Sequence, residues 1–221
     1  MSVKNTLVKR KSVRAFLNKE VNKDTIEKIL EFAKLSPSST NMQPWDVHIL
    51  SKNAKKNLDL KLLEAFDMGI KGQMDYKYYP ETWEEPYKSR RISVGREMYK
   101  ILEIEREDKE GRLKQWRSNY NAFNAPVVMY FFIDSSLEGG SFLDYGMFLQ
   151  SIMLLCVEEG LSCCPMGSLA EYPNIVRKEL NICDSKKLLC GIAVGYEDTM
   201  APINSFRTKR IEIKEFANFH E

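Results

Sequence analysis

The chain has 221 residues, of which 43% are hydrophobic and 29% charged, and its formal net charge is +2 at pH 7. A chain of this length can bury a core without disulfides or metal ions, and its balanced charge excludes a global positive field that would attract nucleic acid or an anionic membrane. It contains only two histidines and five cysteines without a CxxC pair, which disfavours histidine-based hydrolases and zinc sites and is typical of a reducing compartment.

No linker, internal repeat or low-complexity tract divides the chain, so we predict a single domain over residues 1–221. Residues 1–5 lack the apolar run of a secretion signal, and no stretch of about 18 uncharged apolar residues indicates a membrane span. We therefore expect a soluble, cytoplasmic protein. Because general bases and metal ligands are scarce, any chemistry would be carried by a bound cofactor.

The first candidate site is a basic segment near the N-terminus, Arg10-Lys11-Ser12-Val13-Arg14. Arg10, Ser12 and Arg14 alternate, so in an extended segment their side chains point in one direction, and two guanidinium groups and a hydroxyl could clamp one phosphate. The alternative is a solvated basic arm without a ligand. Taken alone, the segment does not decide between the two.

An amphipathic helix is predicted next, beginning after Asn22 and ending near Leu35. Its apolar residues follow the spacing of one buried helix face; they are Ile26, Ile29, Leu30 and Ala33. The helix leads into residues 36–45, called the serine-rich loop below. Residues 46–50 are then predicted to form a strand, and residues 54–68 a second amphipathic helix.

The serine-rich loop reads Ser-Pro-Ser-Ser-Thr-Asn-Met-Gln-Pro-Trp. Pro37 and Pro44 stiffen both ends. Between them lie five side chains that both donate and accept hydrogen bonds, those of Ser38, Ser39, Thr40, Asn41 and Gln43. A flat heteroaromatic ligand with ring nitrogens, carbonyls and a phosphate tail needs such a set, and Trp45 would offer an apolar wall beside it. The alternative is a solvated Ser/Pro-rich connector.

Residues 69–117, called the cover segment below, interleave charged and aromatic side chains. The aromatic residues are Tyr76, Tyr78, Tyr79, Trp83, Tyr87, Tyr99 and Trp116. Aromatic rings with polar tips suit a half-exposed cover over a pocket, and an arginine such as Arg91 could pair with an anionic substrate. Helices packed on the edge of the domain explain the pattern equally well. Single-stranded nucleic acid is a weaker interpretation because acidic residues are mixed in.

Residues 127–133 predict a central buried strand, and residues 142–157 a helix that is apolar almost all round and ends at Gly160. At about 16 residues this helix is too short to span a membrane comfortably, so it should lie in the core or in a subunit interface. Residues 163–168 are predicted to be a loop in which Gly167 lets a flat ligand approach the backbone.

The last predicted elements are a helix over residues 172–180 and a strand over residues 188–196. The adjacent cysteines Cys163 and Cys164 are expected to be core residues, because vicinal cysteines rarely form a disulfide and buried cysteines are common. Residues 201–221, the C-terminal tail, carry apolar side chains that should not hang free in water. We expect the tail to wrap a neighbouring subunit.

The order of these features resembles that of the FMN-dependent nitroreductase family. The resemblance runs almost end to end, and its most specific element is the Ser-Pro-Ser-Ser-x-Asn-x-Gln-Pro-Trp run of the serine-rich loop. It is supported by Arg10-Lys-Ser-x-Arg14, the helix with Gln150, Gly160-Leu161 before Pro165-Met-Gly167, and Gly195-Tyr196 followed by Arg207. The cover segment, with Pro80-Glu-Thr-Trp83 and Glu85-Pro-Tyr87, is similar to the nitroaromatic or nitrobenzoate reductases of that family.

The resemblance implies an α+β protein, a nitroreductase-like α-β-α sandwich with a mixed, mainly antiparallel sheet flanked by helices. It also implies an intertwined homodimer with FMN at each of two subunit interfaces, where the serine-rich loop reaches the flavin from the other subunit. The residues expected to bind FMN are Arg10, Lys11, Ser12, Arg14, Pro37, Ser38, Ser39, Asn41, Gln43, Gln150, Pro165, Met166, Gly167 and Arg207. The residues expected to face a small aromatic acceptor are Tyr76, Trp83, Tyr87 and Arg91.

The implied activity is that of an NAD(P)H oxidoreductase that reduces nitroaromatic, quinone or enone acceptors. NADH or NADPH would give hydride to flavin N5 and leave, and the acceptor would then take its place, without an obligatory side-chain catalyst or metal. A reductive dehalogenase or a flavin-consuming enzyme of the same fold is an alternative, and so is a flavin- or nucleotide-binding module without turnover. A helical protein whose basic arms touch nucleic acid is a third.

Overall fold

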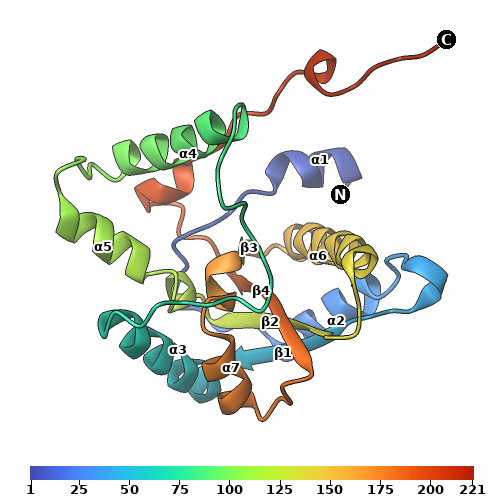
Figure 1. The fold of residues 1–221 in the computed structure, drawn as a ribbon, viewed down its shortest axis with the longest axis horizontal. Helices are drawn as coiled ribbons and strands as arrows, with labels where there is room; N and C mark the ends of the chain where they lie inside the picture. Colours follow the sequence, from blue (N-terminus) through green and yellow to red (C-terminus); the bar gives the residue numbers. More distant parts are fainter.

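The computed structural model describes residues 1–221 and contains one sheet of four antiparallel strands (Figure 1). The strands are β1 (Asp46–Ser51), β2 (Val127–Asp134), β3 (Ser162–Met166) and β4 (Lys186–Gly195). Their order in the sheet is β1-β2-β4-β3, and each neighbouring pair is antiparallel. β2 and β4 therefore lie in the centre, and β1 and β3 form the edges.

The core is organised around β2, in which every residue from Val127 to Ile133 is buried. Successive side chains of a strand point to opposite faces of the sheet. Val128, Tyr130 and Phe132 accordingly join one apolar cluster, and Val127, Met129, Phe131 and Ile133 join the other. The continuous apolar run thus reflects a strand that is covered on both faces.

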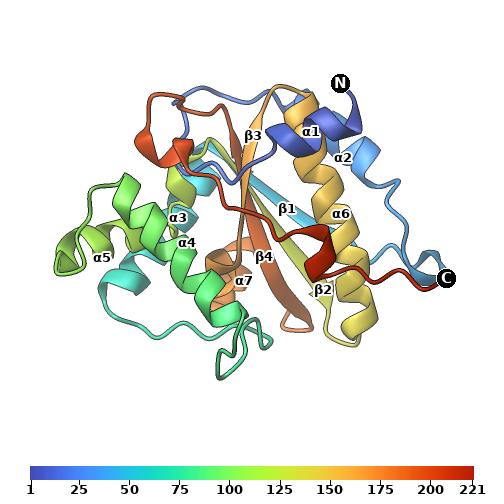
Figure 2. The same cartoon turned by 90° about the horizontal axis from the view of Figure 1, so that it is seen from above.

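Helices cover both faces of the sheet (Figure 2). α2 (Lys23–Ala33) and α6 (Gly139–Glu158) lie on one side, and α3 (Lys52–Asp67) and α7 (Pro173–Leu180) lie on the other. α2 packs against the sheet through Ile26, Ile29 and Ala33, as its apolar spacing predicts. The three layers confirm the expected α-β-α sandwich.

Three further helices lie outside these layers: α1 (Val3–Lys9), α4 (Tyr87–Ile101) and α5 (Lys109–Arg117). The cover segment holds α4 and α5, and residues 70–86 before them contain no helix. This non-helical stretch is fixed to the sheet, because Arg177 donates to both carboxylate oxygens of Asp75 at 2.6 and 3.0 Å and the Leu188 N–H donates to the same carboxylate at 2.8 Å.

The structure corrects three local expectations. Residues 163–166 form strand β3 rather than a loop, and Pro165 is tolerated there because β3 is an edge strand. Helix α1 was not predicted, although Ser2 caps it by accepting a hydrogen bond from the Asn5 N–H. Trp45 is not a free wall beside the loop, since its ring stacks on that of Phe148 at a centroid distance of 4.4 Å.

α6 begins at Gly139 and is longer than predicted. Its 20 residues and a mean hydropathy of 1.4 give it the length and composition of a membrane span, a test that the core helix of a soluble protein also passes. One face of α6 packs on the sheet through residues such as Phe148 and Ile152. On its other face Leu143 is 74% exposed and Met147 is 41% exposed. This open apolar face is typical of a helix that a partner covers.

We expect Phe131→Ala to destabilise the protein by about 3–5 kcal/mol, because it would leave a cavity at a fully buried position between the rings of Tyr145 and Phe148. Urea unfolding at fixed protein concentration measures the change. Leu60→Ala is the matched control, because Leu60 is exposed on α3 and its truncation should cost less than about 1 kcal/mol. Equal losses of unfolding free energy in the two variants would contradict the assignment of Phe131 to the core.

Candidate functional site

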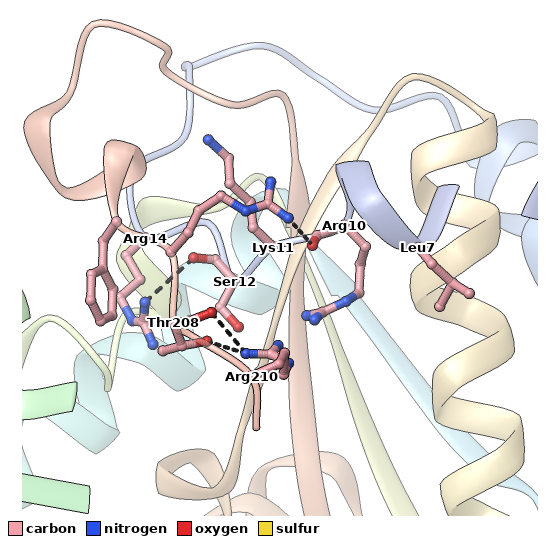
Figure 3. Close-up of a pocket in the computed structure, with 9 residues that line it drawn as sticks. Leu7, Arg10, Lys11, Ser12, Arg14, Thr208 and Arg210 are labelled. Atoms are coloured by element: carbon pink, nitrogen blue, oxygen red, sulfur yellow. Dashed lines mark hydrogen bonds between the residues drawn. The ribbon is translucent and has the colours of Figure 1, made fainter. Parts of the chain in front are cut away.

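A pocket of about 200 Å³ is lined mostly by basic and polar side chains and is called the basic pocket below (Figure 3). Nine residues line it: Leu7, Arg10, Lys11, Ser12, Arg14, Phe206, Arg207, Thr208 and Arg210. Arg10 and Arg14 lie on either side of Ser12, and Arg210 reaches toward the same space. The expected residues Arg10, Lys11, Ser12, Arg14 and Arg207 are therefore brought together.

The N-terminal side of the basic pocket is held by the edge of the sheet. The Val13 N–H donates to the Cys163 carbonyl at 3.1 Å, and Ser12 forms an isolated bridge with Cys163, so the segment runs extended beside β3. In an extended segment alternate side chains share a face, which is why Arg10 and Arg14 lie with Ser12. Lys11 lines the same pocket, so the lining is not limited to the alternating residues.

The C-terminal side is fixed by Asn204, which is 2% exposed. Its side-chain oxygen accepts from the Arg14 N–H at 2.8 Å, and its amide nitrogen donates to the carbonyls of Ala15 and Asp198, both at 2.8 Å. A buried amide that uses both of its ends in this way ties two distant chain segments together. The C-terminal arginines thereby come within reach of the N-terminal ones.

The basic pocket contains an excess of positive charge. Arg10, Arg14, Arg207 and Arg210 form no ion pair with a carboxylate, whereas the Lys11 ammonium lies 2.7 Å from Glu197 and donates to the Asn204 carbonyl at 2.6 Å. Arg207 donates to the carbonyls of Val8 and Arg10, which orients it without neutralising it. Guanidinium groups gathered without counter-charges constitute a site for an anion, and phosphate matches their geometry.

Sequence reasoning missed Asn204, Thr208 and Arg210 as site residues. Arg210 could have been found, because Arg207-Thr-Lys-Arg210 is a short basic run shortly after the last strand. Nothing in the sequence marks Asn204, since a single asparagine near a proline usually indicates only a turn. Its role depends on contacts with residues about 190 positions away, which are visible only in three dimensions.

Pro165, Met166 and Gly167 do not line the basic pocket; they follow Cys163, the residue of β3 with which the basic segment pairs. Met166 is buried, while Pro165 is exposed and Gly167 is half-buried. A Cβ atom at Gly167 would lie 2.8 Å from Cζ of Tyr78, so the Tyr78 ring would have to shift to admit a side chain there.

The serine-rich loop lies elsewhere in the same chain, and none of its residues lines the basic pocket. It contacts α6 near the start of that helix, where the Ser39 N–H donates to Asp144 at 3.1 Å. Its backbone is strained, with positive φ angles of 49° at Thr40, 58° at Asn41 and 49° at Gln43. Such strain is common at binding sites, where it presents polar groups in a fixed arrangement.

Within the loop, Ser38 accepts from the Gln43 N–H at 2.9 Å, whereas the side chain of Asn41 is exposed and makes no hydrogen bond to the protein. Pro37, at the start of the loop, is exposed. Gln150 lies half-buried on α6, outside the basic pocket. One copy of the chain therefore contains both groups of expected FMN-binding residues, those of the basic pocket and those of the serine-rich loop, but does not bring them together in one site.

The four expected acceptor-facing residues occupy different environments. Tyr76 is half-buried, and its hydroxyl donates to the Leu189 carbonyl at 2.8 Å. Arg91 lies over the ring of Trp83 at 5.1 Å, and Tyr87 is 61% exposed at the start of α4. α4 also borders a groove of about 570 Å³ whose other wall is residues 205–211, which adjoin the basic pocket.

Cys163 and Cys164 are buried on opposite faces of β3, each in one of the two apolar clusters. Burial raises the pKa of the Cys164 thiol to about 11, and a hydrogen bond with Cys156 together with burial raises the pKa of Cys163. Because the thiolate is the nucleophile, neither residue suits thiol chemistry. The expected core role is confirmed.

The α-β-α sandwich carries, at the edge of its sheet, an arginine pocket that no carboxylate lines. The model of the Nitroreductase family matches residues 7–196, and the chain belongs to that family. The 4-nitrobenzoate reductase of Pseudomonas putida is 35% identical over 210 residues, which cover 95% of this chain and 92% of that protein.

The chloronitrobenzene nitroreductase of Comamonas testosteroni is 34% identical over 214 residues, 96% of this chain and 94% of that protein. The crystal structure of the FMN and NADPH-dependent nitroreductase NfnB from Sphigopyxis sp. strain HMH aligns over 100% of both chains with a TM-score of 0.97 and 35% identity. The expected fold and the expected nitroaromatic branch of the family are confirmed.

We expect one thiol, Cys183, to react with a thiol-specific reagent such as DTNB in the native protein, because it is the one exposed cysteine. At pH 8 a thiol with a pKa of about 11 is ionised to about 0.1%, and burial also blocks access. All five thiols should react in denaturant, and Cys183→Ser should abolish the native reaction. Rapid native labelling of Cys163 or Cys164 would contradict the burial of β3.

Proposed function

We propose that the chain is an FMN-dependent NAD(P)H oxidoreductase that reduces nitroaromatic acceptors. The observation that carries the proposal is the basic pocket at the edge of β3. The proposal is also supported by relatives that match more than nine tenths of the chain and act on nitroaromatic compounds by name. Each turnover would convert R–NO₂, NAD(P)H and H⁺ into R–NO, NAD(P)⁺ and H₂O.

The residues of the basic pocket fit the phosphate of FMN. Arg10, Arg14 and Arg210 offer N–H donors that no carboxylate occupies, and Ser12 and Thr208 add hydroxyl groups. A volume of about 200 Å³ suits a phosphate and part of its chain but not a whole dinucleotide or flavin. The ring would therefore lie outside the basic pocket, along Pro165, Met166 and Gly167.

When bound, FMN supplies the redox chemistry, because it accepts a hydride from NADH or NADPH and passes the electrons to the acceptor. The role of the protein is to bind FMN and to orient it. The arginines of the basic pocket would hold the phosphate and favour added negative charge on the ligand. No histidine, aspartate or glutamate lines the basic pocket, so the proton that the reaction consumes would come from solvent.

A second copy of the chain would complete the site. The serine-rich loop carries a strained backbone and a free Asn41 side chain but lies away from the basic pocket of its own chain. The open apolar face of α6 and the tail residues Ile213, Phe216 and Phe219, all at least 63% exposed, offer surface for a homodimer. In that dimer the C-terminal tail wraps the partner, and the loop with Pro37, Ser38, Ser39 and Gln43 meets the partner's flavin.

The remaining expectations follow from the same proposal. The cover segment would close the acceptor pocket of this single-domain protein, with α4 adjoining the basic pocket through the groove at residues 205–211. Its aromatic side chains would exclude water and hold a small aromatic acceptor. Five free cysteines are typical of a reducing compartment, which supports a cytoplasmic location for the enzyme.

Absorbance spectroscopy tests the proposal directly. The protein saturated with FMN should be yellow, should lose its absorbance near 450 nm when NADH or NADPH is added without oxygen, and should regain it when 4-nitrobenzoate follows. Colour that persists under excess NADH and NADPH would indicate a flavin-binding module without turnover. A protein that binds no FMN would contradict the proposal as a whole.

We expect Arg210→Ala to raise the dissociation constant for FMN by about 10- to 100-fold, because a charge-assisted hydrogen bond contributes about 1.5–3 kcal/mol. Arg210 donates only to Thr208 and Lys209 within its own segment, so the fold should be unchanged. Fluorescence titration measures the constant. Lys209→Ala is the matched control, because Lys209 does not line the basic pocket.

Riboflavin lacks the phosphate, so its binding shows whether Arg210 contacts the phosphate or another part of the ligand. Its affinity should be the same for wild type and Arg210→Ala if Arg210 contacts the phosphate. An equal loss of affinity for FMN and riboflavin would assign Arg210 to another part of the ligand. Arg14→Ala is expected to weaken FMN binding in the same way.

A further inference from the structure

The groove of about 570 Å³ between α4 and residues 205–211, called the α4 groove below, continues from the basic pocket. Its two walls run side by side in Figure 2. The α4 groove and the basic pocket share four lining residues: Phe206, Arg207, Thr208 and Arg210. A ligand in the α4 groove would therefore lie next to the phosphate of FMN.

One face of α4 lines the α4 groove. Its five lining residues have the spacing of one side of a helix: Arg90, Ser93, Val94, Glu97 and Ile101. α4 contains no buried residue, and Val94 is 37% exposed. On the other wall Ile211 is 36% exposed. The α4 groove thus offers apolar surface that a flat ring such as adenine could cover.

Cations outnumber carboxylates in the α4 groove. The cationic residues are Arg90, Arg207, Lys209 and Arg210, and the one carboxylate is that of Glu97. Arg207 and Arg210 also line the basic pocket, where the FMN phosphate is proposed to bind, whereas Arg90 and Lys209 line the α4 groove alone. With FMN bound, Arg90 and Lys209 therefore remain for a second anion.

Position distinguishes the α4 groove from another groove that also contains arginines. That second groove, of about 970 Å³, lies on the opposite face of α4 and shares no residue with the basic pocket. It is also lined by two carboxylates, those of Glu103 and Glu105. A ligand that must reach the flavin is served better by the α4 groove, which adjoins the proposed FMN site.

We propose that the α4 groove binds the adenosine end of NADPH, with Arg90 and Lys209 paired with the 2′-phosphate. This inference rests on the proposed function and identifies the electron donor. NADPH differs from NADH by that phosphate, so the two cations make NADPH the preferred donor. A volume of about 570 Å³ suits an adenosine with its phosphates and exceeds what one nitroaromatic ring needs.

Flavin reduction by the two donors tests the inference. In anaerobic stopped-flow experiments on the FMN-loaded protein, Arg90→Ala and Lys209→Ala should each raise the dissociation constant for NADPH about 10-fold, the lower end of what one charge-assisted hydrogen bond contributes. The constants for NADH and FMN should not change. Lys88→Ala is the matched control and should behave as wild type, because Lys88 is an exposed cation of α4 that does not line the α4 groove.

Glu97→Gln should have the opposite effect, because it removes the one negative charge of the α4 groove. The dissociation constant for NADPH should fall about 2- to 5-fold, the range of exposed charge pairs, and a folding defect would not tighten binding. Adenosine 2′,5′-bisphosphate, which has the 2′-phosphate but no nicotinamide, should compete with NADPH and bind more tightly than AMP.

Four results would each overturn the inference and leave the proposed function intact. They are unchanged NADPH binding in both alanine variants, equal losses for NADPH and NADH, no binding of the bisphosphate, and a wild-type preference for NADH. Slower reoxidation by 4-nitrobenzoate with unchanged NADPH binding would also overturn it and assign the α4 groove to the acceptor. An FMN-loaded wild type that neither donor bleaches would overturn the proposed function and this inference with it.

Discussion

Four guanidinium groups without a carboxylate partner, those of Arg10, Arg14, Arg207 and Arg210, surround one small pocket. Like charges a few ångström apart repel by roughly 1 kcal/mol per pair even in water, and by more where water is scarce. The protein holds them there with neutral contacts: the pairing of Val13 with Cys163, the hydrogen bonds of Asn204, and the carbonyls that orient Arg207. A bound phosphate would relieve the repulsion that the fold maintains.

The same arrangement explains why the two ends of the chain meet. Arg10 and Arg14 come before the first sandwich helix, and Arg207 and Arg210 come after the last strand. β3 is an edge strand, so its outer side is free to pair with the N-terminal segment, and β4 delivers the C-terminal segment beside it. The fold thereby places a basic site at one edge of a sheet whose centre is entirely apolar.

Much of this could be predicted from the sequence, because the spacing of apolar and charged residues along the chain indicates local secondary structure and which side chains share a face. The apolar spacing of α2, the all-apolar run of β2 and the alternation of Arg10, Ser12 and Arg14 each correspond to one structural feature. β3 was missed because Pro165 and Gly167 are turn signals, and only the edge position of the strand makes the proline acceptable.

The contacts that build the site could not be predicted in this way. Asn204 acts through residues at the other end of the chain, and Tyr78 owes its position to Gly167, almost 90 positions later in the sequence. No periodicity connects such pairs. The serine-rich loop was singled out correctly as unusual, since its strained backbone is present in the structure, but its ligand contacts would require a second copy of the chain.

The central claim is that one copy provides the basic pocket and its partner provides the serine-rich loop. It is tested by tandem purification of heterodimers that combine one copy carrying Arg14→Ala and Arg210→Ala with another carrying Ser39→Ala and Asn41→Ala. Such a dimer has one intact and one doubly damaged site, so it should bind one FMN with wild-type affinity, while both mutant homodimers bind weakly. Heterodimers that bind FMN no better than the homodimers, or a chain that stays monomeric with FMN bound, would contradict the account.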